Sequence, residues 1–440
     1  MTDTQLPTPR RRSTSMPFEK PEEGWTLRAG LDTGDVSFDD STDPRYFEDE
    51  LEAVFRRSWL HIGREFQIPE PGDYFTRAVP GLGTSLLVTR GRDGVVRAFH
   101  NMCTHRGNKL VWEGHPKNEV CGNARRFACK YHGWQFDPEG NLRFVNKEEW
   151  FCDAIDKSEY GLVPVACDTW EGFIFVNLDP KPRETLQEAV GPFVEGLAGY
   201  PFDQLTQMYT FTCEAQANWK IFLDAMVEQY HGNTLHYKLV DQNAAGPLRG
   251  AVGSHFEVFD RNSIWSVAVP AGSLDKESSV REVRPLEKLF QSNLWGQENG
   301  PDIGRPDELP LLNLTRNPGW TNDMFHIYPN FDMLVWDRDW IMVYSTWPLA
   351  VDRVLFEARM YFPPPRNASD RFAQEITAVE FKEFLLQDAN LLECAQSMLS
   401  TGVRSNFPLC DEEVLVRNNH RTSREAVEAY RRERAENRRP

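Results

Sequence analysis

Two short stretches decide the fold of the N-terminal half, NMCTHRG (101–107) and FACKYHGW (127–134). Each stretch carries one cysteine and one histidine, with a glycine one or two positions after the histidine, which suits a tight turn. Each therefore offers a thiolate and an imidazole to a metal. The four candidate ligands are Cys103 and His105 in the first stretch and Cys129 and His132 in the second.

The spacing of these residues discriminates between two kinds of metal site. Two cysteines and two histidines on tight loops could hold a single zinc ion. The C-x-H spacing of Cys103 and His105 is unusual for zinc, but it is natural if the two side chains bind different metal ions. In a Rieske [2Fe–2S] cluster, two thiolates hold one iron and two imidazoles hold the other. The pattern favours a Rieske cluster over zinc, and both over four unrelated residues. Cys121 fits neither pair and is predicted to be a structural thiol.

A second group of possible ligands lies in the predicted helix 219–236. His231 and His236 are five residues apart, which a regular helix does not place on one face. Gly232 and Asn233 could distort the helix so that the two imidazoles converge. Two histidines and one carboxylate form the facial triad of non-haem iron(II) oxygenases. The alternative is a chance pair of histidines in an amphipathic helix.

The carboxylate of such a triad must come from elsewhere in the chain. The best source is the long predicted helix 369–400, which carries Gln387, Asp388 and Glu393. Residues alone leave the choice among these side chains open.

Composition excludes several classes of protein. The 440 residues have a formal net charge of −17, which disfavours binding to nucleic acid. No apolar run approaches the roughly 20 residues that span a bilayer. The N-terminal arginines are not followed by an apolar segment, so no secretory signal is predicted. We therefore expect a cytoplasmic protein whose eight cysteines are thiols or metal ligands.

The periodicity of apolar residues indicates four regions along the chain. They are a flexible arm (1–45), an N-terminal helix with a β-rich domain (46–180), a mixed α and β domain (181–425) and a basic tail (426–440). In the third region we expect a strand at 211–219, helices at 219–236 and 369–400, and three strands at 324–336, 340–349 and 353–362.

These motifs together resemble the large (alpha) subunit of Rieske non-haem iron ring-hydroxylating oxygenases, over residues 45–420. The matching segments are CTHRG (103–107), CKYHGW (129–134), Asn218-Trp219-Lys220 with Glu228-x-x-His231 and His236, and Gln387-Asp388 with Glu393-x-x-Gln396. The resemblance implies an α+β fold, with a small all-β Rieske [2Fe–2S] domain and a larger helix-grip catalytic domain of antiparallel sheet and long helices.

The resemblance also assigns roles to residues. Cys103 and Cys129 would bind one cluster iron, and His105 and His132 the other. His231, His236 and Asp388 would bind one mononuclear Fe(II). Glu228 would bridge the two centres across a subunit interface, by accepting the free N–H of His132 of the partner subunit. This arrangement implies a homotrimer, with or without a small beta subunit.

The implied activity is that of a terminal oxygenase, which uses O2 and electrons from a separate NAD(P)H-linked reductase, with or without a ferredoxin. The expected substrate is a hydrophobic aromatic, polycyclic or steroid-like molecule, hydroxylated above all by cis-dihydroxylation. We expect an apolar pocket from Met226, Val227, Leu235, Phe331 and Trp336. The alternatives are a monooxygenase or O-/N-demethylase on the same machinery, or a Rieske electron carrier only.

Two features depart from the family pattern. The gap between the Rieske loops is long, with additional residues at 115–126. Asp224-Ala225 stands where many relatives have Glu-Asn, which removes an amide often found near the iron.

Overall fold

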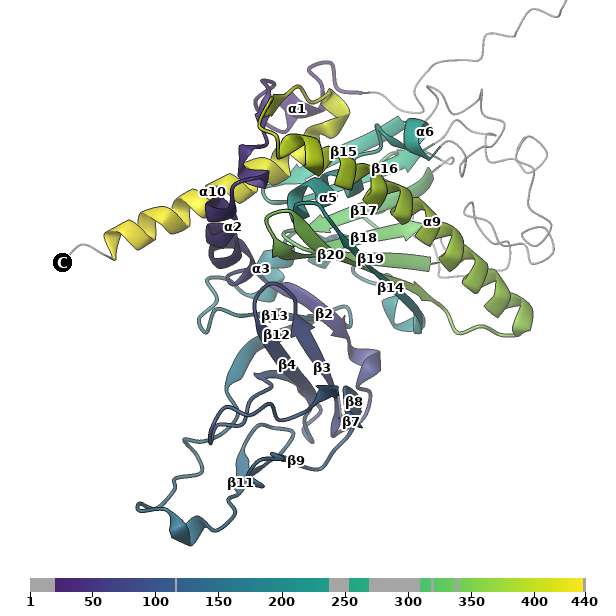
Figure 1. Cartoon of the computed structure of the whole chain (residues 1–440). Coiled ribbons are helices and arrows are strands. Elements are labelled where there is room, and N and C mark those ends of the chain that lie inside the picture. The colour runs from purple at the N-terminus through teal and green to yellow at the C-terminus, as the bar shows by residue number, and fades with distance from the viewer. Residues whose placement is uncertain are drawn as a thin grey trace, which may run out of the picture.

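The computed structural model describes residues 20–114, 117–236, 253–268, 309–317, 320–336 and 340–437. Residues 1–19 of the expected arm, residues 438–440 of the expected tail and the segments 237–252 and 269–308 lie outside these ranges. The described residues form two antiparallel seven-stranded sheets, one in each domain (Figure 1). This arrangement agrees with the α+β fold and with the β-rich first half expected from the sequence.

The sheet of the first domain has the strand order β2-β13-β12-β5-β4-β3-β8. These strands are β2 (Leu60–Arg64), β3 (Asp73–Val79), β4 (Thr84–Arg90), β5 (Val96–His100), β8 (Cys121–Asn123), β12 (Pro164–Trp170) and β13 (Phe173–Asn177). Along β13, Ile174 and Val176 enter one hydrophobic core while Phe173 and Phe175 enter another, because successive side chains of a strand point to opposite faces.

A smaller sheet lies at the end of this domain that is remote from the second domain (Figure 1). It has the order β11-β10-β9, from β9 (Phe127–Ala128), β10 (Gln135–Phe136) and β11 (Leu142–Phe144). The long segment between the two cysteine–histidine loops has structure of its own. It forms β7 (Lys117–Asn118), which pairs with β6 (Glu113–Gly114), and β8, which extends the seven-stranded sheet beside β3.

The sheet of the second domain has the order β14-β20-β19-β18-β17-β16-β15. The strands are β14 (Gln207–Ala215), β15 (Gly253–Phe259), β16 (Asn262–Ala268), β17 (Trp320–Ile327), β18 (Phe331–Trp336), β19 (Trp340–Ala350) and β20 (Arg353–Phe362). Three strands were predicted between 324 and 362, but the structure has four there, β17 to β20. The segment 324–336 turns at residues 328–330 and contributes to two strands, with a cis peptide bond at Tyr328–Pro329.

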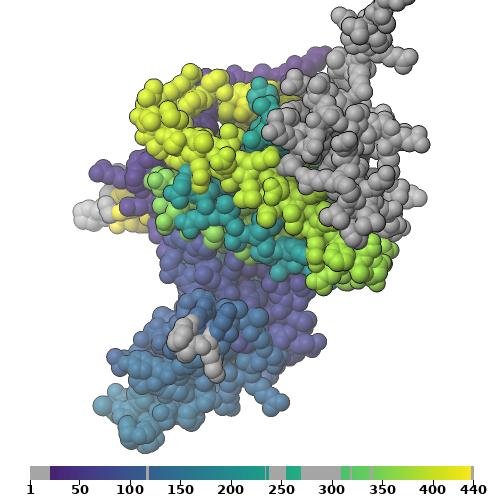
Figure 2. Space-filling view, turned by 45° about the vertical axis from the view of Figure 1, so that its right-hand side comes forward, coloured from purple at the N-terminus to yellow at the C-terminus, as the bar shows by residue number. Residues whose placement is uncertain are grey.

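The two faces of this sheet are covered by different elements (Figure 1). Helices α5 (Trp219–Met226), α9 (Ala368–Leu399) and α10 (Val414–Glu436) pack with one face. The first domain and the short helices α3 (Leu186–Val190) and α4 (Phe193–Gly196) pack on the other face. The first domain nevertheless projects as a separate lobe, drawn in blue below the second domain in Figure 2.

The described part of the expected flexible arm is folded, which corrects that prediction for residues 20–45. Helix α1 (Trp25–Arg28) is held by Asp411, whose carboxylate accepts the backbone N–H groups of Trp25 and Thr26 at 2.9 Å. Strand β1 (Val36–Ser37) pairs with β21 (Asn406–Phe407). Residues 426–436 likewise belong to α10 and form no separate tail.

A buried ion pair joins the N-terminal segment to α5. Glu50 ends α2 (Pro44–Glu50), which continues as a π-helical turn over Leu51–Phe55. Lys220 Nζ donates to Glu50 Oε1 at 2.5 Å and the Trp219 indole donates to Glu50 Oε2 at 3.2 Å, with both charged side chains fully buried. A buried pair of charges is costly to break, because the remaining charge has no water to solvate it.

Replacing Lys220 with Met should therefore lower the free energy of unfolding by about 3–5 kcal/mol, because Glu50 would stay buried without its countercharge. Urea unfolding followed by circular dichroism measures the change. The exposed pair of Arg366 and Asp370 provides the control, and Arg366→Ala should leave the midpoint nearly unchanged. Equal midpoints for both variants would contradict the stabilising role of the buried pair.

Candidate functional site

The segment that carries the two histidines begins as a well-capped helix. Asn218 caps α5 by accepting the backbone N–H of Lys220 at 2.9 Å, and its own N–H donates to Gln396 of α9 at 2.8 Å. Helix α5 ends at Met226, and a second short helix, α6, runs from Gly232 to Leu235. The expected distortion therefore comes before Gly232, at residues 227–231.

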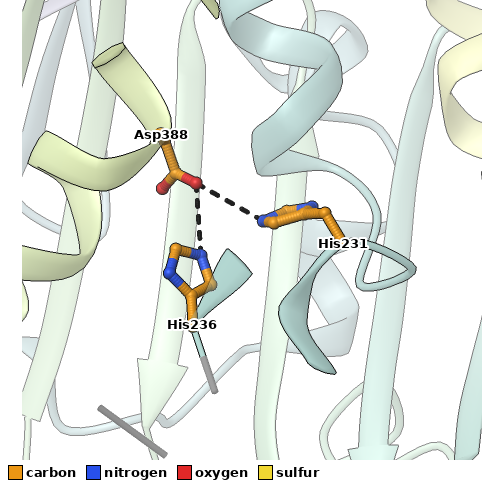
Figure 3. Close-up of side chains that lie close together, drawn as sticks. All are labelled: His231, His236 and Asp388. Atoms are coloured by element: carbon orange, nitrogen blue, oxygen red, sulfur yellow. Dashed lines mark ion pairs between the residues drawn. The ribbon is translucent and has the colours of Figure 1, made fainter. Parts of the chain in front are cut away.

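The break brings the two imidazoles to one carboxylate (Figure 3). His236 Nε2 lies 3.2 Å from Asp388 Oδ1, and His231 Nε2 lies 3.5 Å from the same oxygen. One ligand atom from each of the three residues lies within 4.8 Å of the others. Asp388 comes from the middle of α9, so the site joins two segments about 150 positions apart in the sequence. The prediction that these three side chains converge agrees with the geometry.

The outer nitrogen of each imidazole has its own acceptor. His231 Nδ1 hydrogen-bonds Glu228 Oε1, and His236 Nδ1 lies 3.0 Å from Gln387 Oε1. Acceptors of this kind fix the tautomer and the ring orientation, so that each Nε2 presents a lone pair to the metal. The contact of Gln387 was missed from the sequence, although its position beside Asp388 was a signal. Glu393 accepts the backbone N–H of Gln216 at 2.9 Å and does not join the group.

At this site, burial and the neighbouring charges shift the pKa values of the side chains in opposite directions. Burial alone would raise the pKa of Asp388, but the two histidines outweigh it and the pKa is lowered. Burial alone would lower the pKa of His231, but the neighbouring carboxylates of Asp388 and Glu228 raise it to about 10. Asp388 Oδ1 is buried and makes no hydrogen bond of good geometry. Two imidazole nitrogens and one such carboxylate oxygen fit a divalent iron.

The two cysteine–histidine loops have matching backbones. The N–H of Cys103 donates to Asn108 at 2.8 Å, and the N–H of Cys129 donates to Trp134 at 2.8 Å. In each loop a glycine donates back to the cysteine carbonyl at 2.9 Å. Gly107 and Gly133 have φ of 73° and 76°, a conformation that favours glycine.

These loops also bring their side chains together. The ring centroids of His105 and His132 are 4.6 Å apart, and Trp134 stacks on His105 at 4.8 Å. Burial raises the pKa of the Cys103 thiol to about 11, and contact with the Cys129 thiol adds to the rise. His105 Nδ1 is buried without a hydrogen-bond partner, as expected of a nitrogen that binds a metal.

The four donors fall into two like pairs. The Cys103 and Cys129 thiols are in contact with each other, and the His105 and His132 rings pack together. A Rieske cluster needs this pairing, because two thiolates hold one iron and two imidazoles hold the other. Cys121 is exposed on β8 and lies outside this group.

The expected lining of the substrate pocket is partly wrong. Phe331 points to the sheet face that meets the first domain, where it packs on His61 with ring centroids 5.0 Å apart. Trp336 lies on the helix-covered face, against Phe381 of α9. Met226 and Val227 are buried in the core on that same face. Phe331 and Trp336 are five positions apart along one strand, an odd number, so they point to opposite faces.

Two family models match this chain. Residues 58–150 match the Rieske [2Fe-2S] domain, and residues 202–429 match the ring hydroxylating alpha subunit (catalytic domain). The chain belongs to the Rieske ring-hydroxylating oxygenase alpha subunits. A [2Fe–2S] cluster and a mononuclear iron are the cofactors of this family, in agreement with the two sites described above.

Similar curated proteins act on quaternary ammonium compounds. The chain is 34% identical over 221 residues to the carnitine monooxygenase oxygenase subunit of Escherichia coli strain K12, a match covering 49% of this chain and 53% of that protein. It thus spans about half the length of this relative. It is 32% identical over 336 residues to the glycine betaine monooxygenase oxygenase subunit of Pseudomonas aeruginosa PAO1, covering 71% of this chain and 70% of that protein.

Solved structures agree on the fold. A quaternary ammonium Rieske monooxygenase in complex with L-carnitine superposes with a TM-score of 0.68 at 21% identity, covering 92% of this chain and 99% of that one. Naphthalene 1,2-dioxygenase from Rhodococcus sp. bound to indole superposes with a TM-score of 0.66 at 20% identity, covering 89% and 94%. No helix among the described residues is long and apolar enough to cross a membrane.

Replacing Cys129 with Ser should abolish the electron paramagnetic resonance signal of the reduced Rieske cluster, because a hydroxyl is a poor substitute for a thiolate ligand. Cys121→Ser is the matched control and should keep the signal, since Cys121 is exposed and distant from the paired loops. A normal signal from the Cys129 variant would overturn the ligand assignment.

Replacing Gln387 with Leu should weaken binding of the mononuclear iron by about 10–100-fold, because His236 Nδ1 loses its acceptor. Competition with a chelator of known affinity measures the change, while the visible spectrum of the Rieske cluster should stay the same. Glu393→Gln should retain the iron. Loss of iron from the Glu393 variant alone would make Glu393 the carboxylate ligand in place of Asp388.

Proposed function

We propose that this chain is the terminal oxygenase of a multicomponent system and that it hydroxylates a quaternary ammonium compound. The observation that carries the oxygenase assignment is the convergence of His231, His236 and Asp388 on one point, in a chain that also holds paired cysteine–histidine loops. Three protein ligands leave positions open on an iron for O2 beside a bound substrate.

Different residues of the chain have different roles in this proposal. Cys103, Cys129, His105 and His132 hold the cluster, and His231, His236 and Asp388 hold the iron. Glu228 and Gln387 orient the two imidazoles. The bound iron supplies O2 activation, and the overall monooxygenation is C–H + O2 + 2 e⁻ + 2 H⁺ → C–OH + H2O. Hydroxylation of an N-methyl group would release formaldehyde and the demethylated amine.

Two observations bear on the substrate. The relatives that oxidise carnitine and glycine betaine support a quaternary ammonium compound and monooxygenation, which was the alternative expected from the sequence. The second candidate is dihydroxylation of an aromatic ring. The apolar side chains of Met324, Leu334 and Met342 on the helix-covered face favour that candidate, because they would pack well on a planar hydrocarbon.

Electron delivery is proposed to occur between subunits. Within one chain, β9 and β11 at the Rieske tip lie far from α6 (Figure 1). Tyr131 and Trp150 near the Rieske loops are exposed, Trp150 by 72%, and Tyr230 beside Glu228 is exposed by 65%. Exposed aromatic side chains of this kind suit a contact between copies of the chain. A homotrimer would place His132 of the partner subunit against Glu228.

The chain needs an electron donor in this scheme. We propose a separate NAD(P)H-linked reductase, with or without a ferredoxin, because the sequence carries no fingerprint for binding a dinucleotide. The cluster accepts one electron at a time from such a partner.

The proposed reaction is tested by product analysis with ¹⁸O-labelled O2. The holoenzyme with a matched reductase is supplied with carnitine, glycine betaine, choline, naphthalene and indole in parallel. We expect one labelled oxygen in the product of a quaternary ammonium substrate, or in the released formaldehyde. A cis-diol with two labelled oxygens, formed only from naphthalene or indole, would overturn monooxygenation in favour of the second candidate.

Replacing Glu228 with Gln should slow electron transfer and leave both centres occupied. The amide keeps the shape but removes the charge that holds His231 and would face His132 of the partner subunit. In single turnover with pre-reduced protein, cluster oxidation coupled to product should slow by about 10–100-fold. Glu412→Gln removes the charge of a nearby carboxylate and is the control. Unchanged oxidation in the Glu228 variant would leave Glu228 without a bridging role.

A further inference from the structure

The helix-covered face of the catalytic sheet carries one row of polar side chains. Ser263, His326, Asp332 and Tyr344 are successive partners across β16, β17, β18 and β19. All four are buried, with at most 3% exposure. Residues directly opposite on neighbouring strands lie side by side on one face, so the four side chains form a continuous polar row.

The neighbouring row, two residues along each strand, is apolar. It consists of Trp265, Met324, Leu334 and Met342. All four belong to the same hydrophobic core, as the alternation of a half-buried sheet predicts. The polar row is therefore a local exception on a face that otherwise packs on helices, and its burial needs an explanation.

The polar row lies beside the metal ligands. Phe381 of α9 packs on Trp336, and Asp388 follows about 10 Å further along the helix. Asp332 lies about 13 Å from Trp336 along β18, so the two carboxylates lie at similar distances from the contact of Phe381 with Trp336. In agreement, the pKa of Tyr344 is raised well above its usual value, first by burial and then by the charges of Asp388 and Asp332.

Within the row, Asp332 and His326 form a pair with unsatisfied acceptors. His326 Nδ1 lies 2.6 Å from Asp332 Oδ1. The carboxylate accepts, so Nδ1 donates and Asp332 fixes the orientation of the imidazole ring. His326 Nε2, Asp332 Oδ2 and Ser263 Oγ are all buried without a hydrogen-bond partner. Buried polar atoms normally find partners, so a group absent from the free chain is expected here.

The missing group should be positively charged. Among the described residues, His326 is the ion-pair partner of Asp332, and neither Lys nor Arg approaches it. Burial raises the pKa of Asp332 more than His326 lowers it, so a cation bound beside the pair would stabilise the ionised carboxylate that burial disfavours. Tyr344 and Trp265 add aromatic faces next to the pair, and such faces attract cations.

We propose that the carboxylate of Asp332, hydrogen-bonded to His326, selects the cationic group of the substrate and holds it between the apolar row and the metal ligands. This inference rests on the proposed function and names the residue of this chain that would select the substrate. Asp332 acts through charge, while the apolar row packs against the methyl groups of a quaternary ammonium. The carbon to be oxidised is then positioned towards Asp388 and the two histidines.

The test compares two ligands of equal shape that differ by one charge, glycine betaine and 3,3-dimethylbutanoate. Dissociation constants are measured by calorimetry on the oxidised holoenzyme, whose iron content and cluster spectrum report folding. The wild-type protein should prefer glycine betaine by about tenfold or more. Asp332→Asn should reduce this preference to about one, with binding of 3,3-dimethylbutanoate, which lacks the cationic nitrogen, within about twofold of the wild-type value.

Two further variants separate the possible outcomes. Asp323→Asn is the matched control, because Asp323 is a buried carboxylate on β17 whose partners are Ser266, Asn313 and Trp320. It should keep the preference. His326→Gln removes the partner and leaves the carboxylate, so it should keep or strengthen the preference.

A preference that survives in the Asp332→Asn protein would overturn the inference and leave the proposed function intact. A wild-type protein that prefers 3,3-dimethylbutanoate would overturn both the inference and the quaternary ammonium substrate. Equal loss of preference in the Asp332 and Asp323 variants would also overturn the inference, because the effect would then be a general consequence of removing buried charge.

Discussion

The iron site depends on how α5 is held against α9. The N–H of Asn218, at the start of α5, donates to the side chain of Gln396, near the end of α9, and this hydrogen bond is buried. Asn218 also donates to the carbonyl of Val351, at the turn between β19 and β20. One residue therefore sets the position of α5 relative to both α9 and the sheet. The two histidines that follow α5 and the carboxylate on α9 meet only because this register holds.

The N-terminal segment completes the same arrangement from outside. Gln396 also donates to the carbonyl of Ser41, and Lys220 reaches Glu50 and the carbonyl of Asp40. Residues far from the metal ligands in sequence thus restrain the helix that precedes them. A ligand set is useful only if its supporting shell is rigid, since small displacements of imidazole rings lower metal affinity. This need for a rigid supporting shell explains why residues 20–45 are folded and do not form a loose arm.

The sequence predicted best what is local in the chain. The Rieske loops lie within short motifs, so their candidate ligands could be named from spacing, and the long helix 369–400 was found within one residue at each end. Prediction failed where the outcome depends on tertiary packing. The break in 219–236 comes before Gly232 because Glu228 folds back onto the backbone N–H groups of Tyr230 and His231. Phe331 was misplaced because the register of β18 is set by its neighbours, and a shift of one residue exchanges the faces.

The two faces of the catalytic sheet show how one strand can serve two purposes. On β18, Phe331, Met333 and Val335 pack towards the Rieske domain, while Leu334 and Trp336 pack under the helices. The alternation is interrupted on the helix side by Asp332, a residue that fold stability alone would not place there. Departures from an otherwise consistent pattern are expected at functional sites, because the chain accepts a local cost where chemistry requires it. The same reasoning applies to Glu228, a carboxylate held in a helix break, and both exceptions lie beside the metal ligands. The catalytic domain therefore concentrates its unfavourable features on the one face where the substrate and the iron would meet.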